Sequence, residues 1–93
     1  MDLNVEHNEK AHRYSARIEG EEAVADYMEE GDTVVFTHTV VPESQRGRGV
    51  GDELVRQALE DTRRRGRKIA ASCPFVVRYL ERDPEYKDAE EAS

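Results

Sequence analysis

Residues 36–59 read FTHTVVPESQRGRGVGDELVRQAL. A run of strand-forming residues ends at Pro42, a glycine-rich loop follows, and apolar residues then recur at helical spacing. Backbone N–H groups at a helix N-terminus lack intrahelical partners and carry the positive end of the helix dipole. The alternate glycines allow close approach of a ligand to the backbone, and Arg46 and Arg48 add positive charge. The stretch therefore predicts an anion site, best suited to phosphate or pyrophosphate.

Two familiar phosphate-binding loops do not match this one. A Walker A loop is excluded because no Gly-Lys-Ser/Thr follows four residues after a glycine. The dinucleotide fingerprint fits its first two glycines on Gly47 and Gly49, but Asp52 stands where the third is required. The spacing Gln/Arg-x-x-Gly-x-Gly within Gln45–Gly51 instead resembles the pyrophosphate loop of the GNAT superfamily of N-acetyltransferases.

The resemblance extends beyond the loop to about residues 3–87. His38-Thr39-Val40-Val41-Pro42 precedes the loop, and Cys73-Pro74-Phe75-Val76-Val77-Arg78-Tyr79 and Pro84-Glu85-Tyr86 follow it. In this order the blocks look like the small single-domain YjdJ-type branch of the superfamily. One position departs from that branch, which usually has His-Pro-Glu-Tyr where this chain has Asp83-Pro84-Glu85-Tyr86. No role of that histidine is therefore carried over.

The resemblance implies acetyl-coenzyme A as co-substrate, in a cleft where the central strand and the strand after the helix separate. Its pyrophosphate is expected on the N–H groups of residues 46–51, and its pantetheine arm along the main chain of residues 39–41. The alternative is that the glycines only form a tight strand–helix turn. The residues expected to bind the co-substrate are Thr39, Val40, Val41, Gln45, Arg46, Gly47, Arg48, Gly49, Val50 and Gly51.

Three side chains are candidates for the chemistry. Cys73 ends a strand at a helix start, where a thiolate is favoured, so it is either an acetyl acceptor or base, a channel-lining residue, or an inert buried thiol. Tyr79 either donates a proton to the departing coenzyme A thiolate, as the resemblance implies, or packs in the core. His38 is either a general base, since histidine exchanges protons near neutral pH, or a buried histidine with satisfied hydrogen bonds.

Hydrophobic periodicity predicts one α+β domain over residues 1–93, and the resemblance implies that this domain has a compact GNAT-like fold. Its sheet is mostly antiparallel, and a βαβ unit brings the last strand parallel to the central one. Apolar residues on both faces of 33–41 predict a central strand covered on both sides. The acidic residues 88–93 are expected to fray. The predicted strands are Leu3–His7, His12–Glu19, Glu22–Met28, Thr33–Val41 and Lys68–Ser72, and the predicted helices run from about Arg46 or Arg48 to Arg65, with Gly66 as C-cap, and over Phe75–Arg82.

Composition narrows the function classes. The net charge of −7 argues against nucleic acid or an anionic membrane as partner. Cys73 is the single cysteine, so no internal disulfide forms, and His7, His12 and His38 do not sit at metal-ligand spacings. No apolar run is long enough to span a bilayer and the N-terminus has no basic-then-apolar pattern, so we expect a cytoplasmic protein, a monomer or weak dimer.

The resemblance implies an N-acetyltransferase that moves an acetyl group from acetyl-coenzyme A to a primary amine. Side chains of proteins or peptides are candidate acceptors, because the short chain has no extra helices to wall an acceptor site. The main alternative is a non-catalytic module that binds a coenzyme A thioester. A nucleotide-binding regulator is a third possibility, for which ATP or NAD would compete with acetyl-coenzyme A.

Overall fold

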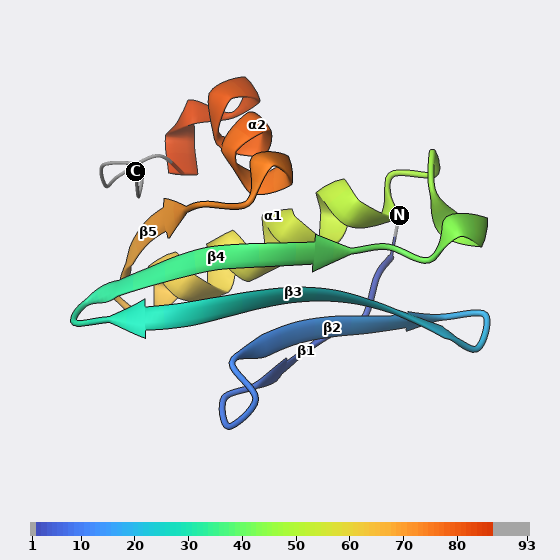
Figure 1. Cartoon of the computed structure of the whole chain (residues 1–93), viewed down its shortest axis with the longest axis horizontal. Helices are drawn as coiled ribbons and strands as arrows, with labels where there is room; N and C mark the ends of the chain where they lie inside the picture. Colours follow the sequence, from blue (N-terminus) through green and yellow to red (C-terminus); the bar gives the residue numbers. More distant parts are fainter. Residues whose placement is uncertain (1, 87–93) are drawn as a thin grey trace.

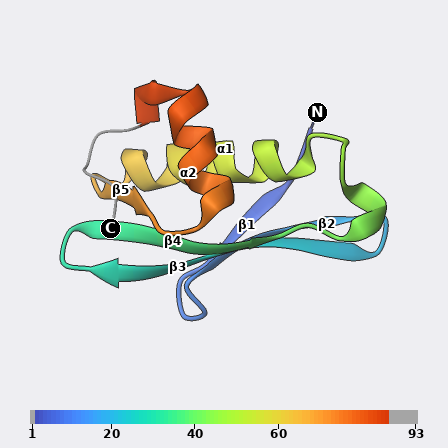
Figure 2. The same ribbon diagram turned by 45° about the horizontal axis from the view of Figure 1, so that its top comes forward.

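The computed structural model describes residues 2–86, which form a five-stranded sheet with two helices packed against one face (Figures 1 and 2). The strands lie in the order β1-β2-β3-β4-β5. The first four are antiparallel and β5 is parallel to β4, which confirms the predicted α+β architecture. The bounds are β1 (Val5–Asn8), β2 (Arg13–Ile18), β3 (Glu21–Glu30), β4 (Thr33–Val40), α1 (Val50–Arg64), β5 (Lys68–Ala71) and α2 (Pro74–Arg82), with short 3-10 turns η1 (Glu43–Gln45) and η2 (Pro84–Tyr86).

The core lies between the sheet and α1. This was predicted by the alternation of apolar residues along the strands and by their helical spacing along α1. Alternate residues of β2 and β3 are buried beneath the helix, because successive side chains of a strand point to opposite faces. The predicted apolar stripe of α1 is confirmed. The buried residues of these elements include Tyr14, Ala16, Ala23, Ala25, Tyr27, Val50, Leu54, Val55, Ala58, Leu59 and Thr62.

β4 is covered less completely than the sequence suggested. Both described helices lie on the same side of the sheet (Figure 2), yet Val35, which points to the other face, is only 4% exposed. The expected burial of both faces therefore holds over residues 34–36 and not beyond them. Asp26 pairs with His38 and Tyr27 with Phe36, which leaves Thr37 as an extra residue in a β-bulge. Beyond this bulge His38 and Val40 are exposed on the open face.

β4 and β5 separate at the bulge. Their pairing ends at Phe36 opposite Ala71. The N–H groups of Ser72 and Cys73 then both donate to the carbonyl oxygen of Phe36, at 3.0 and 3.2 Å. Past this point no described strand pairs with β4 on that side, so the edge of β4 is open from there toward the glycine loop.

Helix α1 starts later than predicted, at Val50 instead of Arg46 or Arg48. Gly47 and Gly49 have φ values of +79° and +83°, a left-handed conformation that cannot continue into a right-handed helix. At the other end Gly66 follows the last turn with φ +76°, as expected of a glycine that terminates a helix.

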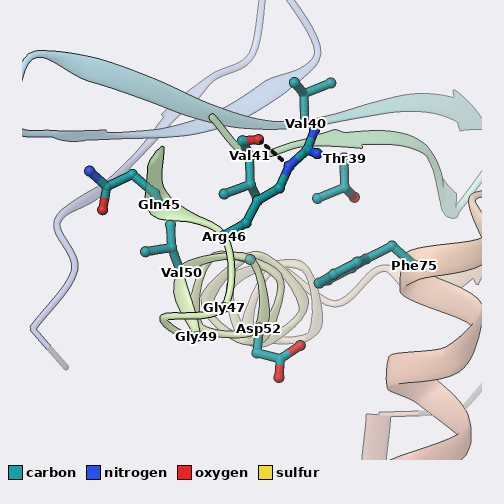
Figure 3. A pocket seen from close by; sticks show the side chains of 11 residues that line it. Thr39, Val40, Val41, Gln45, Arg46, Gly47, Gly49, Val50, Asp52 and Phe75 are labelled. Carbon is teal, nitrogen blue, oxygen red and sulfur yellow. Dashed lines mark hydrogen bonds between the residues drawn. The ribbon is translucent and has the colours of Figure 1, made fainter. Parts of the chain in front are cut away.

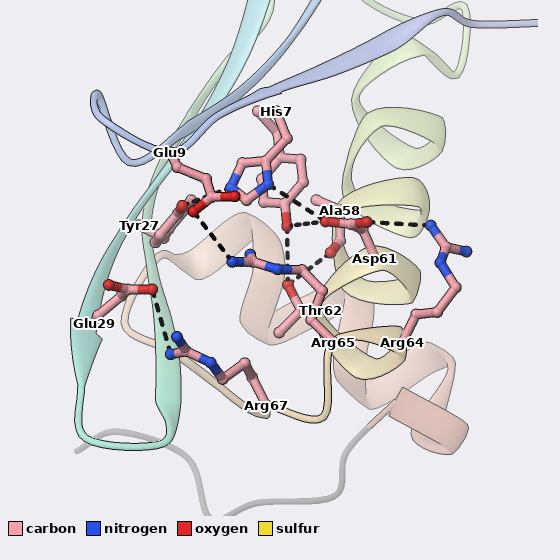
Figure 4. A network of polar contacts seen from close by, with 11 residues as sticks. His7, Glu9, Tyr27, Glu29, Ala58, Asp61, Thr62, Arg64, Arg65 and Arg67 are labelled. Atoms are coloured by element: carbon pink, nitrogen blue, oxygen red, sulfur yellow. Dashed lines mark hydrogen bonds and ion pairs between the residues drawn. The ribbon is translucent and has the colours of Figure 1, made fainter.

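β1 runs over Val5–Asn8, a small shift from the predicted range, because Asn8 still pairs with Arg13. A polar network ties this edge strand to the end of α1 (Figure 4). The Tyr14 hydroxyl donates to Asp61 at 2.7 Å, and His7 contacts both Asp61 and, at 2.6 Å, the Tyr27 hydroxyl. Burial lowers the pKa of His7, which favours its neutral form at physiological pH.

The predicted frayed segment 88–93 lies outside the described residues. Over residues 2–86, neither helix has the length and apolarity needed to cross a bilayer.

Candidate functional site

A pocket of about 610 Å³ opens between the end of β4 and the N-terminus of α1 (Figure 3). It lies where β5 has left β4, so the open strand edge forms one wall and the glycine loop the other. All the predicted co-substrate residues except Arg48 line it. The lining consists of Thr39, Val40, Val41, Gln45, Arg46, Gly47, Gly49, Val50, Gly51, Asp52 and Phe75.

The loop presents unpaired backbone donors to this pocket. From Gly47 to Asp52, no N–H group donates to an acceptor within the described part of the chain, and the first α-helical bond runs from Glu53 to Gly49 at 3.0 Å. The Arg46 N–H, in contrast, donates to the Glu43 carbonyl at 3.2 Å in η1. The predicted run of free donors over 46–51 is therefore shifted by one residue, to 47–52.

The two loop arginines have different surroundings. Arg46 crosses the pocket and donates from Nε to the Val41 carbonyl at 3.2 Å (Figure 3). Arg48 turns away, donates to the Gln45 side chain at 3.1 Å and lies 3.7 Å from the Glu19 carboxylate. The Arg48 side chain therefore does not line the pocket, whereas its N–H group belongs to the free run, so co-substrate binding by Arg48 stays a prediction.

The β2–β3 hairpin supports the loop, which sequence reasoning missed. The buried Gln45 side chain donates to Glu19 at 3.1 Å, and the Ser44 hydroxyl donates to Glu21. The only sequence signal was the pair of acidic residues flanking Gly20, which by itself indicates no more than a turn.

Phe75 is a second residue that sequence reasoning missed. Its ring lies against the first turn of α1, where a Cβ added to Gly51 would stand 2.8 Å from it. Gly51 is therefore required by packing between α1 and α2, and Phe75 forms the apolar end of the pocket. In the sequence Gly51 and Phe75 belong to separate motifs, and no local pattern indicates that the two residues are in contact.

Cys73 lies close to the pocket but does not line it. It is the residue before α2, is 6% exposed, and its Sγ is 3.7 Å from the Thr39 hydroxyl oxygen. Since Thr39 lines the pocket, the thiol sits just behind the open edge of β4. This position is compatible with either a reactive or a channel-lining cysteine.

His38 and Tyr79 are not brought together with Cys73. His38 pairs with Asp26 while the next residue, Thr39, pairs with the buried Ala25, so the imidazole lies on the open face of the sheet. It is exposed, so the buried-histidine interpretation is wrong.

Tyr79 is 8% exposed and packs between the helices and η2, with its ring 6.5 Å from that of Tyr86. Burial raises the pKa of Tyr79 to about 12. The side chain does not line the pocket, so the geometry favours core packing over proton donation.

No group of three or more His, Cys, Asp or Glu side chains within residues 2–86 is arranged to hold a metal ion. The pocket's polar wall instead combines the backbone donors and the Arg46 guanidinium with the side chains of Thr39 and Gln45 and with the Asp52 carboxylate, which is paired with Arg82. Such a wall suits an anion, and the apolar side chains of Val41, Val50 and Phe75 suit an extended chain attached to it.

Comparison with known proteins gives matches over most of the chain. A family model described as GCN5-related N-acetyl-transferase matches residues 13–89. Protein NATD1 of Gallus gallus is 31% identical over 85 residues, 88% of this chain and 77% of NATD1, and the Xenopus tropicalis protein is 32% identical, over 88% and 78%. The NMR solution structure of a GCN5-like candidate N-acetyltransferase from Staphylococcus aureus superimposes with a TM-score of 0.73 at 26% identity, over 98% of this chain and 91% of that one. The YjdJ-type branch stays a prediction.

Proposed function

The chain belongs to the GCN5-related N-acetyltransferase family, and we propose that it binds acetyl-coenzyme A between β4 and α1 and transfers the acetyl group to a primary amine. The observation that carries the proposal is the pairing of two unsatisfied backbone surfaces in one pocket. These are the N–H groups of residues 47–52 and the open edge of β4 beyond Phe36.

Each surface suits one part of the co-substrate. The loop donors and Arg46 carry partial and full positive charge toward the position of a pyrophosphate. The edge at Thr39 and Val40 offers main-chain groups to the amides of a pantetheine arm, much as an added strand would, and the Val41 carbonyl joins them when Arg46 turns from it to the pyrophosphate. A thioester held this way ends in the gap between β4 and β5.

The acceptor amine then approaches from the open face of the sheet, because the helices occupy the other face. Its nitrogen attacks the thioester carbonyl carbon, the carbon–sulfur bond breaks, and coenzyme A leaves as a thiolate. The ammonium formed on the amine loses one proton. His38 is on the open face just past the bulge, so it is the candidate to accept that proton.

Cys73 offers a second route to the same product. In that route its sulfur takes the acetyl group from coenzyme A, and the amine attacks the resulting acetyl-cysteine. We favour direct attack, because a bound thioester needs no second thioester to be reactive. The two routes leave different traces on the protein.

We expect the protein, mixed with acetyl-coenzyme A and a set of amines and peptides, to acetylate at least one amine without acquiring an acetyl group itself. Mass spectrometry of the protein and of the amines checks this. Cys73→Ala should keep coenzyme A affinity, since the loop is unchanged, and should keep most of its transfer activity.

Other outcomes have clear meanings for this proposal. An acetyl adduct on Cys73, labile to hydroxylamine, with transfer lost in Cys73→Ala, would replace direct attack by the covalent route. Saturable coenzyme A binding with no transfer to any amine would favour the non-catalytic binding module. Absence of coenzyme A binding by calorimetry would overturn the proposal as a whole.

Arg46→Ala should weaken coenzyme A binding by about 1–2 kcal/mol, the size of a charge-assisted hydrogen bond to phosphate. Arg48→Ala is the matched control, since it removes the same charge from the same loop but from a side chain turned toward Glu19. Calorimetry at low and at molar salt should show a loss for Arg46→Ala that shrinks as screening increases. Equal losses in both variants would mean that only the net charge of the loop matters.

A further inference from the structure

A second hollow lies next to the pocket, between the first turn of α1 and the outer side of α2. It has a volume of about 440 Å³ and is lined by Asp52, Phe75, Arg78, Glu81 and Arg82. Asp52 and Phe75 also line the first pocket, so the two spaces meet at these residues. A ligand longer than the first pocket can therefore continue into the second without crossing the core.

Two arginines of α2 give this hollow its cationic side. Arg82 donates to the Asp52 carboxylate at 2.9 Å, and both side chains are about half exposed, at 60% and 46%. Arg78 is exposed one helical turn earlier and makes no hydrogen bond or ion pair with any described residue. Its charge is thus available to a ligand at no cost in existing contacts.

Arg82 also neutralises a carboxylate, that of Asp52, next to the loop donors. The Asp52 carboxylate lies in the first turn of α1, at the wall where the N–H groups await an anion. An unpaired carboxylate there would repel phosphate, and its ion pair with Arg82 offsets that repulsion. Glu81 brings a second carboxylate to the hollow, so the attraction for a phosphate is moderate.

We propose that this hollow takes the 3′-phosphate of the adenosine end of coenzyme A, with Arg78 and Arg82 as its cationic contacts. This rests on the proposed function, which sets the pyrophosphate on the loop beside Asp52. The 3′-phosphate and the diphosphate are attached to the same ribose, so they stay a few bonds apart. A diphosphate at the loop therefore leaves the 3′-phosphate near the mouth of the adjacent hollow.

The test compares coenzyme A with 3′-dephospho-coenzyme A, which lacks only the phosphate in question. The wild-type protein should bind coenzyme A about tenfold more tightly, as one exposed charge-assisted contact would give. Arg78→Ala and the double variant Arg78→Ala/Arg82→Ala should reduce that ratio to about one. Arg64→Ala is the matched control, because it removes one exposed arginine from the far end of α1 and should keep the ratio.

Isothermal titration calorimetry gives both affinities, and thermal unfolding followed by circular dichroism verifies that each variant is folded. Arg78 has no partner among the described residues, so its variant should unfold at the wild-type temperature. Equal wild-type affinity for the two ligands, or a ratio that survives in the double variant, overturns the assignment while leaving the proposed function intact. Failure to bind either ligand would overturn the proposed function, and this assignment with it.

Discussion

Gly49→Val is expected to abolish coenzyme A binding, a loss of at least about a hundredfold in affinity, in a domain that still folds. A Cβ at Gly49 meets nothing within 4 Å, so the new side chain would project into space that the ligand needs. It would also strain the loop, because Gly49 has φ +83° and a β-branched residue disfavours that conformation by about 1–2 kcal/mol.

The control for Gly49→Val separates strain from obstruction. Gly66 has φ +76°, also has open space around a Cβ, and lies at the other end of α1. Gly66→Val should therefore lower the free energy of unfolding by a similar amount and leave coenzyme A affinity unchanged. Affinities come from calorimetry and stabilities from urea unfolding. Normal binding by Gly49→Val would remove the loop from the proposed site.

Phe36→Ala is expected to lower the free energy of unfolding by about 3–5 kcal/mol, the usual cost of emptying a fully buried aromatic position. Phe36 is 0% exposed and its ring lies 6.2 Å from that of Tyr14 and 6.0 Å from that of Tyr27. A small domain has only about 5–15 kcal/mol of stability in total, so this single change removes a large share of it.

Urea unfolding monitored by circular dichroism measures this effect. Met28→Ala is the control on the same sheet, and since Met28 is 48% exposed it should cost no more than about 0.5 kcal/mol. If Phe36→Ala does not fold, Phe36→Leu should still do so with a loss below about 1.5 kcal/mol. A loss below about 1 kcal/mol in Phe36→Ala would mean that the core is not packed around this ring.

The local elements followed from local signals. Alternation at Tyr14, Ala16, Ala23 and Ala25 and helical spacing along α1 each need fewer than twenty residues to recognise, and each is buried as predicted. The predicted boundary that was wrong is the start of α1, next to the glycine loop. Helical residues were expected from Arg46 onward, but positive φ at two glycines delayed the helix to Val50.

The backbone part of the candidate site could be predicted from the sequence, whereas the directions of its side chains could not. Free N–H groups at the start of a helix follow from the strand–glycine–helix order itself, so the loop could be identified from residues 36–59. The direction of Arg48 could not be, because it depends on Glu19, which the chain places on a different hairpin. Phe75 was missed for the same reason, since its contact with Gly51 exists only once α2 packs on α1.

By itself, the sequence determined the order of strands and helices, the position of the glycine loop that we propose binds an anion, and the family resemblance that the comparisons support. Tertiary structure decided the rest. The bulge at Thr37 sets His38 on the open face and Thr39 toward the core, and packing against η2 takes Tyr79 away from the pocket. The physical reason is the distance along the chain over which each kind of interaction acts. Propensity and periodicity act between neighbours along the chain, whereas the face and the partners of a side chain depend on segments that only folding brings together.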